Sequence, residues 1–341
     1  MILTFKVRHN NDFSIEFAKA RQIVEFGLGQ RKLGVFLTSK HVKHFGLKSL
    51  ISNQLLRKYC KNIKTKSIKY IKLPICGQGI KFKNDVISIP CLKLSFKFHP
   101  HKTIELVKSI EIGDTYYYIA CEIKCQDQIG ENLEKYIGVD LNSTGHCAVV
   151  ANPSTGKILK LGKNCNHIRN KYFNIRRKLQ KLGKYKVIKT LGNKEQRIIR
   201  DINHKISLKI VKFAKQNQCN IKLENLKGIR KNTKGKKALS RNVNNWSFYQ
   251  LQQMIVYKAK LHGIKVFFVN PYLTSQIDSK TGIRGARSGK IFNSPIFGVE
   301  NADVNAAFNI ALSNDFQLLA ESDVNKGRSD EPQMAMATKA S

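Results

Sequence analysis

The sequence predicts an α/β fold, in which a mixed sheet flanked by helices follows a smaller strand-rich segment. Short apolar runs alternate with amphipathic helical segments between residues 136 and 312. Hydrophobic residues make up 42% of the chain, which is enough to form a packed core. A length of 341 residues corresponds to one large or two ordinary domains.

The first 135 residues have mostly strand character, with a helical insertion. Residues 2–9 predict a strand, and residues 92–98 and 115–124 predict two more, since apolar side chains alternate with polar ones or β-branched and aromatic residues prevail. Between them, residues from about 12 to 63 carry apolar side chains at three- and four-residue steps, which indicates helix. The polar residues 125–134 predict a linker, so we expect a first domain over 1–135.

The second segment, residues 136–312, predicts strands and helices in a defined order. Three strands come first, followed by helices, a strand, a helix, a strand and a last helix. The expected strands are 137–141, 146–151, 157–161, 220–224 and 264–269, and the expected helices are 170–182, 195–216, 247–261 and 303–312. This is the order of an RNase H-like domain, although many α/β domains share it. Residues 313–341 are expected to form a flexible tail.

The chain carries a large positive charge. It has 61 Lys and Arg against 23 Asp and Glu, a net charge of +38. Residues 151–240 hold 26 basic and 3 acidic side chains, a difference of +23. Self-repulsion on this scale weakens a compact state unless a polyanion neutralises it, and nucleic acid is the expected partner. A Lys-rich solvated surface is the alternative explanation.

Several classes of protein do not fit the sequence. No run of about 18 apolar residues occurs, so we expect no membrane span and no membrane partner. The N-terminus lacks the basic start and apolar core of a secretory signal. The eight cysteines are scattered, which is typical of reduced thiols in a cytoplasmic protein, nucleoid-associated when bound to DNA.

Three carboxylates stand out in the region that is poorest in acids. Asp140 and Glu224 each lie at the end of a predicted strand, and Asp303 opens a predicted helix. Converging carboxylates repel one another, and Mg²⁺ or Mn²⁺ relieves the repulsion. Two such ions could hold a phosphodiester for attack by water. Each acid also has a structural explanation when it is taken singly. Asp140 could end its strand, and Glu224 could pair with Arg230. Asp303 could be the N-cap or a first-turn residue of its helix, where the helix dipole favours a negative charge.

The sequences around these acids resemble the TnpB (OrfB-type) family of transposon-encoded nucleases. The segment Tyr136-Ile-Gly-Val-Asp140-Leu resembles the first RuvC motif of that family, and Ile221-Lys-Leu-Glu224-Asn-Leu-Lys-Gly-Ile-Arg230 resembles the second. The segment Ala302-Asp303-Val-Asn-Ala-Ala-Phe-Asn-Ile310 resembles the third. The resemblance runs from about residue 136 to residue 312 and is weaker before it.

The resemblance implies an RNA-guided DNA endonuclease related to the compact type V CRISPR effectors. It implies a wedge-like β-barrel over 1–135 with a helical recognition insertion at about 12–63, followed by a RuvC-like nuclease domain over 136–312. The implied partners are a guide RNA from the transposon end and a double-stranded DNA target with a short adjacent motif. It also implies that Asp140, Glu224 and Asp303 bind two magnesium or manganese ions and are catalytic.

Two other functions stay open. One is an RNA-guided DNA-binding protein whose nuclease is weak or inactive. The other is an unguided RNase H-like transposase, which would need no RNA.

The sequence departs from the family over residues 273–299. Family members carry a zinc ribbon there, built from two Cys-x-x-Cys pairs, and the matching positions hold Asp278, Thr281, Ser294 and Phe297. These side chains cannot form a tetrahedral thiolate site, so we expect no structural zinc. A small apolar cluster is expected in its place, formed by Ile277, Ile283, Ile291, Phe292, Ile296 and Phe297.

Basic residues near the motifs are candidates for contacts with nucleic acid. They share a cationic side chain that can bind phosphate. They are Arg176, Arg177, Lys178, Lys205, Arg230, Arg284 and Arg287.

Overall fold

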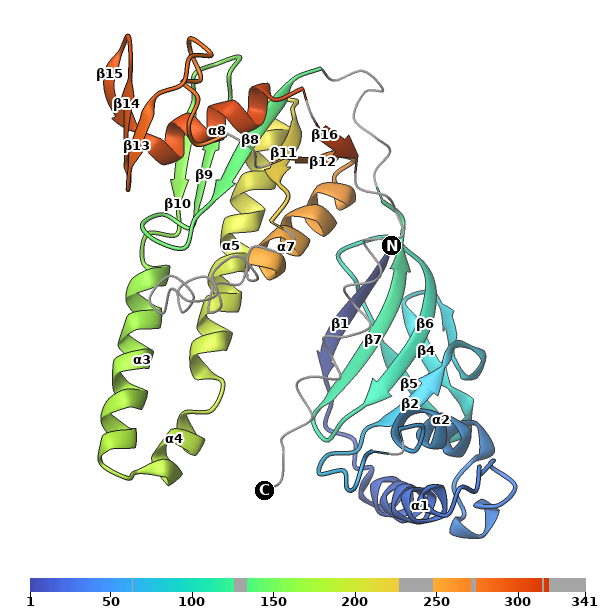
Figure 1. The fold of residues 1–341 in the computed structure, drawn as a ribbon. Coiled ribbons are helices and arrows are strands. Elements are labelled where there is room, and N and C mark those ends of the chain that lie inside the picture. The colour runs from blue at the N-terminus through green and yellow to red at the C-terminus, as the bar shows by residue number, and fades with distance from the viewer. Residues whose placement is uncertain (63, 126–133, 227–247, 271–273, 315, 319–341) are drawn as a thin grey trace. The chain divides into compact units, whose positions relative to one another are not determined.

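The computed structural model describes residues 1–62, 64–125, 134–226, 248–270, 274–314 and 316–318 (Figure 1). The chain divides into two compact units, Met1–Lys124 and Cys125–Ser341. In these described ranges, no helix combines the length and the apolar character needed to cross a membrane.

The first unit contains two antiparallel sheets and two helices. One sheet has the order β1-β7-β6-β2 and the other β3-β4-β5. The strands are β1 (Ile2–Arg8), β2 (Leu73–Cys76), β3 (Lys81–Lys83), β4 (Val86–Ile89), β5 (Leu94–Lys97), β6 (Ile104–Ile112) and β7 (Tyr116–Ile123). The helices are α1 (Ser14–Lys32) and α2 (Ser49–Tyr59), and short 3₁₀ turns occupy Lys43–Phe45, Gly77–Gly79 and Pro90–Leu92.

The two sheets and both helices of the first unit share one hydrophobic core. Ile110 and Ile119 from the first sheet, Ile87 from the second and Ile51 from α2 are all fully buried in it. The expected β-barrel is not seen as a closed barrel among the described residues, because the two sheets remain separate. Two sheets that cover each other's apolar face need no closure to exclude water.

A six-stranded mixed sheet is the centre of the second unit. Its order is β10-β9-β8-β11-β12-β16. The strands are β8 (Tyr136–Leu141), β9 (Ala148–Ala151), β10 (Ile158–Leu161), β11 (Asn220–Glu224), β12 (Val266–Val269) and β16 (Phe316–Leu318). β8, β11 and β12 run parallel, whereas β9, β10 and β16 pair antiparallel with their neighbours.

Helices α5 (Lys194–Gln216), α7 (Phe248–Leu261) and α8 (Ala302–Leu312) cover the faces of this sheet. Helix α3 (Cys165–Lys181) packs on α5, and the short α4 (Tyr185–Leu191) packs on α3. Ala148 and Val150 of β9 belong to the core shared with α5 and α7, whereas Val149 packs with Ala307 of α8. Because successive side chains of a strand point to opposite faces, α8 lies on the face opposite α5 and α7 (Figure 1).

A small antiparallel sheet precedes α8. It consists of β13 (Ala286–Ser288), β14 (Ile291–Ser294) and β15 (Gly298–Asn301). Asn301 ends β15 and is also the N-cap of α8, so this sheet is joined directly to the helix.

Most of the elements predicted from periodicity are confirmed within a few residues. The strands at 2–9, 137–141, 157–161 and 220–224 and the helix at 195–216 are examples. The sequence interpretation missed β2, β3, β4, β6, β16, α4 and the small sheet. Several of these are strands of three or four residues, too short for periodicity to show. The linker and Arg230 lie wholly or largely outside the described residues, and so does most of the expected tail. The described residues Phe316–Leu318 of that tail form β16, which pairs with β12, so the prediction of a tail from residue 313 was wrong there.

Candidate functional site

Two of the three predicted acids lie side by side at the carboxyl end of parallel strands. β8 and β11 are neighbours, and their register pairs Val139 with Leu223. Asp140 and Glu224 are the next residues of the two strands. Adjacent strands lie about 4.8 Å apart, so this register brings both acids to one edge of the sheet.

The third acid reaches the same edge from α8. Asp303 lies in the first turn of the helix, where the side chain of Asn301 accepts hydrogen bonds from the backbone N–H of Asp303 at 3.2 Å and of Val304 at 3.1 Å. Helix α8 packs very closely on β8. A methyl group added at Gly138 would lie 2.0 Å from the carbonyl oxygen of Ala307, so only glycine permits this approach.

Asp140 is buried and electrostatically strained. Burial, together with the negative charges of Glu224 and Asp303, raises the pKa of Asp140 to about 7. The amide Nδ2 of Asn142 donates a hydrogen bond of 2.6 Å to Asp140 Oδ2 and acts in the opposite direction. A cation bound nearby would stabilise the ionised form of this buried carboxyl group.

Glu224 is held by the segment that precedes the small sheet. The hydroxyl of Thr274 donates a short hydrogen bond to its carboxylate, and the amide of Gln252 donates to its backbone carbonyl at 2.8 Å. Burial raises the pKa of Glu224, although the Thr274 hydrogen bond and the charge of Arg287 lower it. The side chain therefore has a fixed position beside the sheet edge.

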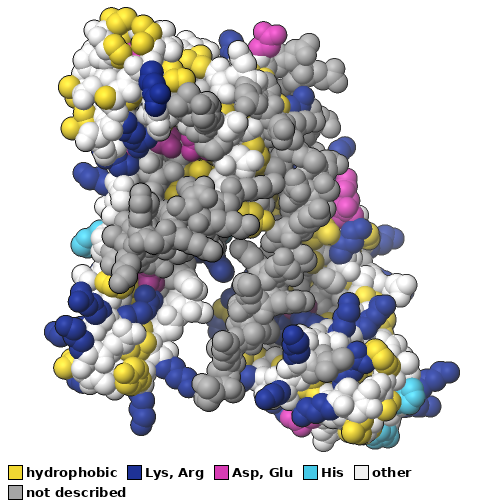
Figure 2. All heavy atoms as spheres, viewed as in Figure 1, with side chains coloured by type: hydrophobic (Ala, Val, Ile, Leu, Met, Phe, Trp, Pro, Cys, Tyr) yellow, Lys and Arg dark blue, Asp and Glu magenta, His cyan; other side chains and the backbone are white. Residues whose placement is uncertain are grey.

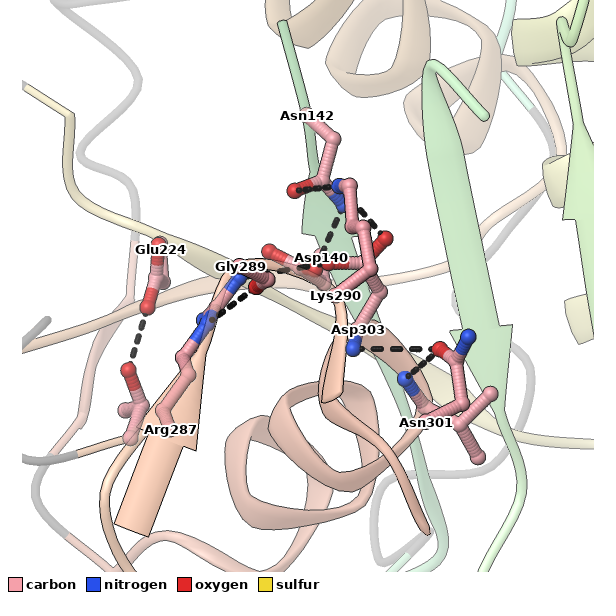
Figure 3. A network of polar contacts seen from close by, with 10 residues as sticks. Asp140, Asn142, Glu224, Arg287, Gly289, Lys290, Asn301 and Asp303 are labelled. Atoms are coloured by element: carbon pink, nitrogen blue, oxygen red, sulfur yellow. Dashed lines mark hydrogen bonds and ion pairs between the residues drawn. The ribbon is translucent and has the colours of Figure 1, made fainter. Parts of the chain in front are cut away.

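Two cations of the β13–β14 hairpin lie among the acids. Lys290 Nζ is 2.7 Å from Asp303 Oδ2, and Arg287 Nη2 is 3.3 Å from Asp303 Oδ1 (Figure 3). The charge of Arg287 also lowers the pKa of Asp140 and of Glu224. Arg287 therefore interacts with all three acids, as its position between Glu224 and the aspartates in Figure 3 illustrates.

The acids meet at one edge without forming a closed ligand cluster. Within the described part of the chain, no three His, Cys, Asp or Glu side chains are grouped closely enough to hold one metal ion. The donor set nevertheless fits a hard divalent cation, because three carboxylates supply oxygen ligands. The pKa of Asp140 is raised first by burial and then by the negative charges of Glu224 and Asp303, and a cation would offset both effects. In the structure, Arg287 and Lys290 supply part of that compensation.

A hydrogen-bonded network occupies the region where the family's zinc ribbon is expected. The carboxylate of Asp278 is fully buried and accepts a short hydrogen bond from the Ser294 hydroxyl and one of 2.9 Å from the backbone N–H of Lys280. Ser294 Oγ in turn accepts from the backbone N–H of Phe297 at 2.9 Å. Thr281 also hydrogen-bonds Asp278. This network therefore joins the turn at 279–281 to the turn at 295–297, and all four positions belong to it.

The expected apolar cluster is not formed there. Phe292 is fully buried, but Ile283, Ile291, Ile296 and Phe297 are each about half exposed. The prediction was wrong because the buried polar side chains of Asp278 and Ser294 fill the centre of this region. Hydrogen bonds, rather than apolar contacts, join its two turns.

The candidate nucleic-acid contacts are dispersed. Arg176 of α3 pairs with Glu195 at 2.5 Å, Lys205 pairs with Asp201 at 2.8 Å, and Arg284 donates to Gln276 at 2.7 Å. Arg177 and Lys178 lie on α3, and both are exposed. Figure 2 shows Lys and Arg side chains around the end of the second unit where α3 and α4 meet (lower left).

Sequence reasoning missed several polar partners of the acids. Asn142, Thr274 and Lys290 each contact one of them. Asn142 could have been found, since it follows Asp140 by two residues at the same strand end. Thr274 lies far from Glu224 in the sequence, and Lys290 lies in a hairpin turn before Asp303, so no local pattern marks either of them.

Comparisons with known proteins agree on one family. Residues 248–310 match the model described as Cas12f1-like, TNB domain. The chain is 32% identical over 226 residues to the CRISPR-associated endodeoxyribonuclease Cas12f1 of Sulfoacidibacillus thermotolerans, covering 61% of this chain and 52% of that protein. It is 31% identical over 195 residues to the TnpB-like protein MJ0751 of Methanocaldococcus jannaschii, covering 53% of this chain and 69% of that protein.

The fold has a counterpart among solved structures. A chain of the cryo-EM structure of a Cas12f1-sgRNA-target DNA complex superposes with a TM-score of 0.61 at 17% identity, over 89% of this chain and 83% of that chain. The fold is therefore Cas12f-like. The matched region nevertheless spans only about half the length of the Cas12f1 relative, 52%.

Proposed function

Because the chain belongs to the family of TnpB-like and Cas12f proteins, relatives of the compact type V CRISPR effectors, we propose that it is an RNA-guided DNA endonuclease associated with a transposable element. Its reaction is the hydrolysis of DNA phosphodiesters. The observation that carries the proposal is the register of β8 and β11, which aligns Asp140 with Glu224 at the edge where Asp303 lies in the first turn of α8.

Asp140, Glu224 and Asp303 are proposed to hold two Mg²⁺ or Mn²⁺ ions. Bound ions would lower the pKa of the attacking water and stabilise the leaving oxygen. The chain's own residues prepare the site for this. Asn142 orients the carboxylate of Asp140, and Thr274 fixes that of Glu224.

The second unit is proposed to be a RuvC-like nuclease domain of the RNase H class. The strand order β10-β9-β8-β11-β12, with β8, β11 and β12 parallel, supports this assignment. The first unit is proposed to be the wedge-like domain, with α1 and α2 as its recognition insertion. The network around Asp278 and Ser294 would replace the zinc ribbon of the family.

The proposed partners are a guide RNA and a double-stranded DNA target with a short adjacent motif. The net charge of +38 supports this, because it calls for a polyanion. Basic residues of α3, such as Arg177 and Lys178, would contact phosphates rather than bases. The solved Cas12f1 chain with the similar fold is itself bound to a guide RNA and target DNA, which also supports these partners.

The test is cleavage by purified protein that carries its co-purified RNA. Asp140→Asn should abolish magnesium-dependent cleavage and leave DNA binding intact. Asp201→Asn is the matched control, since Asp201 is exposed and pairs with Lys205 on α5, so it should cut like the wild type. Undiminished cutting by Asp140→Asn would remove the metal-site assignment. Cutting by RNA-free protein would favour the unguided transposase.

The second candidate is an RNA-guided DNA-binding protein with weak or no nuclease activity. The ion pairs of Lys290 and Arg287 with both oxygens of Asp303 favour it, because they occupy groups that a catalytic ion needs. Guide-dependent DNA binding without cleavage at any magnesium concentration would establish this function instead.

A further inference from the structure

Both carboxylate oxygens of Asp303 are already paired with cations from one hairpin. Lys290 Nζ lies 2.7 Å from Oδ2 and Arg287 Nη2 lies 3.3 Å from Oδ1. The Asp303 side chain is only 5% exposed. A buried carboxylate gains more from such pairing than an exposed one, because water screens the charges less.

Lys290 also links Asp303 to Asp140. Its Nζ donates to Asn142 Oδ1 at 3.2 Å, while Asn142 Nδ2 donates to Asp140 Oδ2 at 2.6 Å (Figure 3). The ammonium group therefore lies at the end of β8, with one aspartate bound directly and the other through an amide. A divalent ion shared by the two aspartates would neutralise the same carboxylates that Lys290 now contacts directly or through Asn142.

The two cations differ in how easily they can leave. Lys290 lies in the two-residue turn between β13 and β14, and its side chain is 37% exposed on a flexible four-carbon stem. Arg287 is less exposed, at 29%, and its Nε donates to the carbonyl of Gly289 at 3.1 Å. Lys290 is therefore the cation that can withdraw into solvent while the hairpin keeps its shape.

We propose that Lys290 is a built-in counter-cation that competes with divalent metal for Asp303 and so sets the metal affinity of the site. This inference rests on the proposed function, because it takes the three acids to be metal ligands. In the metal-free protein, Lys290 neutralises Asp303 and limits repulsion between the acids. When metal binds, the ammonium group leaves Asp303 and the ion takes its place.

Binding of Mn²⁺ to the protein, without nucleic acid, tests this directly by electron paramagnetic resonance titration. Lys290→Met keeps the aliphatic stem and removes the charge, so it should lower the Kd for Mn²⁺ by about tenfold. Lys290→Arg keeps the charge and should not tighten binding. Lys280→Met is the matched control, since Lys280 pairs with Glu300 in the same region and should leave the Kd unchanged.

The outcomes separate this inference from the proposed function. Tighter binding by Lys290→Met that Asp303→Asn abolishes supports both. Wild-type binding that Lys290→Met leaves equal or weakens overturns the role of Lys290 alone, provided that circular dichroism shows the variant to be folded like the wild type. Absence of Mn²⁺ binding in both proteins, or binding that survives Asp303→Asn, overturns the metal site and the inference together.

Discussion

The hydroxyl of Ser294 donates a hydrogen bond to the buried carboxylate of Asp278. Asp278 precedes the turn at 279–281, and Ser294 ends β14 before the turn at 295–297, in the region where the sequence resemblance implies a zinc ribbon. The Asp278 carboxylate accepts from the backbone N–H of Lys280, and Ser294 Oγ accepts from that of Phe297. A polar side-chain pair thus holds the two turns together, and its strength can be measured.

The first prediction concerns zinc. Purified protein should contain far less than one zinc per chain by mass spectrometry of the metal content, and a strong chelator should not lower its melting temperature. The reason is that Asp278, Thr281, Ser294 and Phe297 offer no thiolate. One tightly bound zinc per chain would contradict this.

The second prediction concerns the pair itself. Ser294→Ala should lower the free energy of unfolding of the second unit by about 1–3 kcal/mol, because a buried carboxylate loses a donor. Urea unfolding followed by circular dichroism measures the change. Ser288→Ala in the exposed strand β13 is the matched control and should change stability by less than about 0.5 kcal/mol. Equal changes in the free energy of unfolding for the two variants would mean that the Asp278–Ser294 hydrogen bond does not stabilise the protein.

The third prediction is a dependence of stability on pH. Burial alone would raise the pKa of Asp278, but hydrogen bonds from Ser294, Lys280 and Thr281 hold it below the ordinary value of 3.8. A carboxyl with a depressed folded-state pKa contributes stability that is complete above its unfolded pKa and is lost as the pH falls through the folded one. The wild type should therefore exceed Asp278→Asn in free energy of unfolding by a constant amount near neutral pH, and by less below pH 3.8. A difference that grows on acidification would show that the pKa of Asp278 is raised rather than lowered.

The fourth prediction concerns the contact between β8 and α8. Gly138→Ala should destabilise the second unit by about 3 kcal/mol, because the new methyl group would overlap the backbone of Ala307. It should also abolish cleavage, since Asp303 would move away from Asp140. Gly29→Ala is the control, because Gly29 lies in α1 with no atom near the added methyl group. Thermal unfolding with a parallel cleavage assay measures both effects, and a Gly138→Ala protein as stable as the wild type would show that the contact is loose.

The sequence predicts those parts of the fold where one periodicity persists over several turns or alternations. Helix α5 and strand β8 are examples, and the acids Asp140 and Glu224 are marked by the strand ends they occupy. The small sheet of β13, β14 and β15 escapes prediction, because its short strands are largely exposed and alternate too briefly. The place of Lys290 beside Asp303 depends on how that sheet docks, which is a tertiary property.

The register between β8 and β11 has a consequence for how such a chain can change over time. Peptide hydrogen bonds, not side chains, fix the interval between Asp140 and Glu224. A slip of one residue would turn one acid to the opposite face, so intermediate spacings do not exist. Descendants of this chain can thus remodel their turns and replace their surface while they inherit the same interval between the two acids, and the proposed site can outlast most of the protein around it.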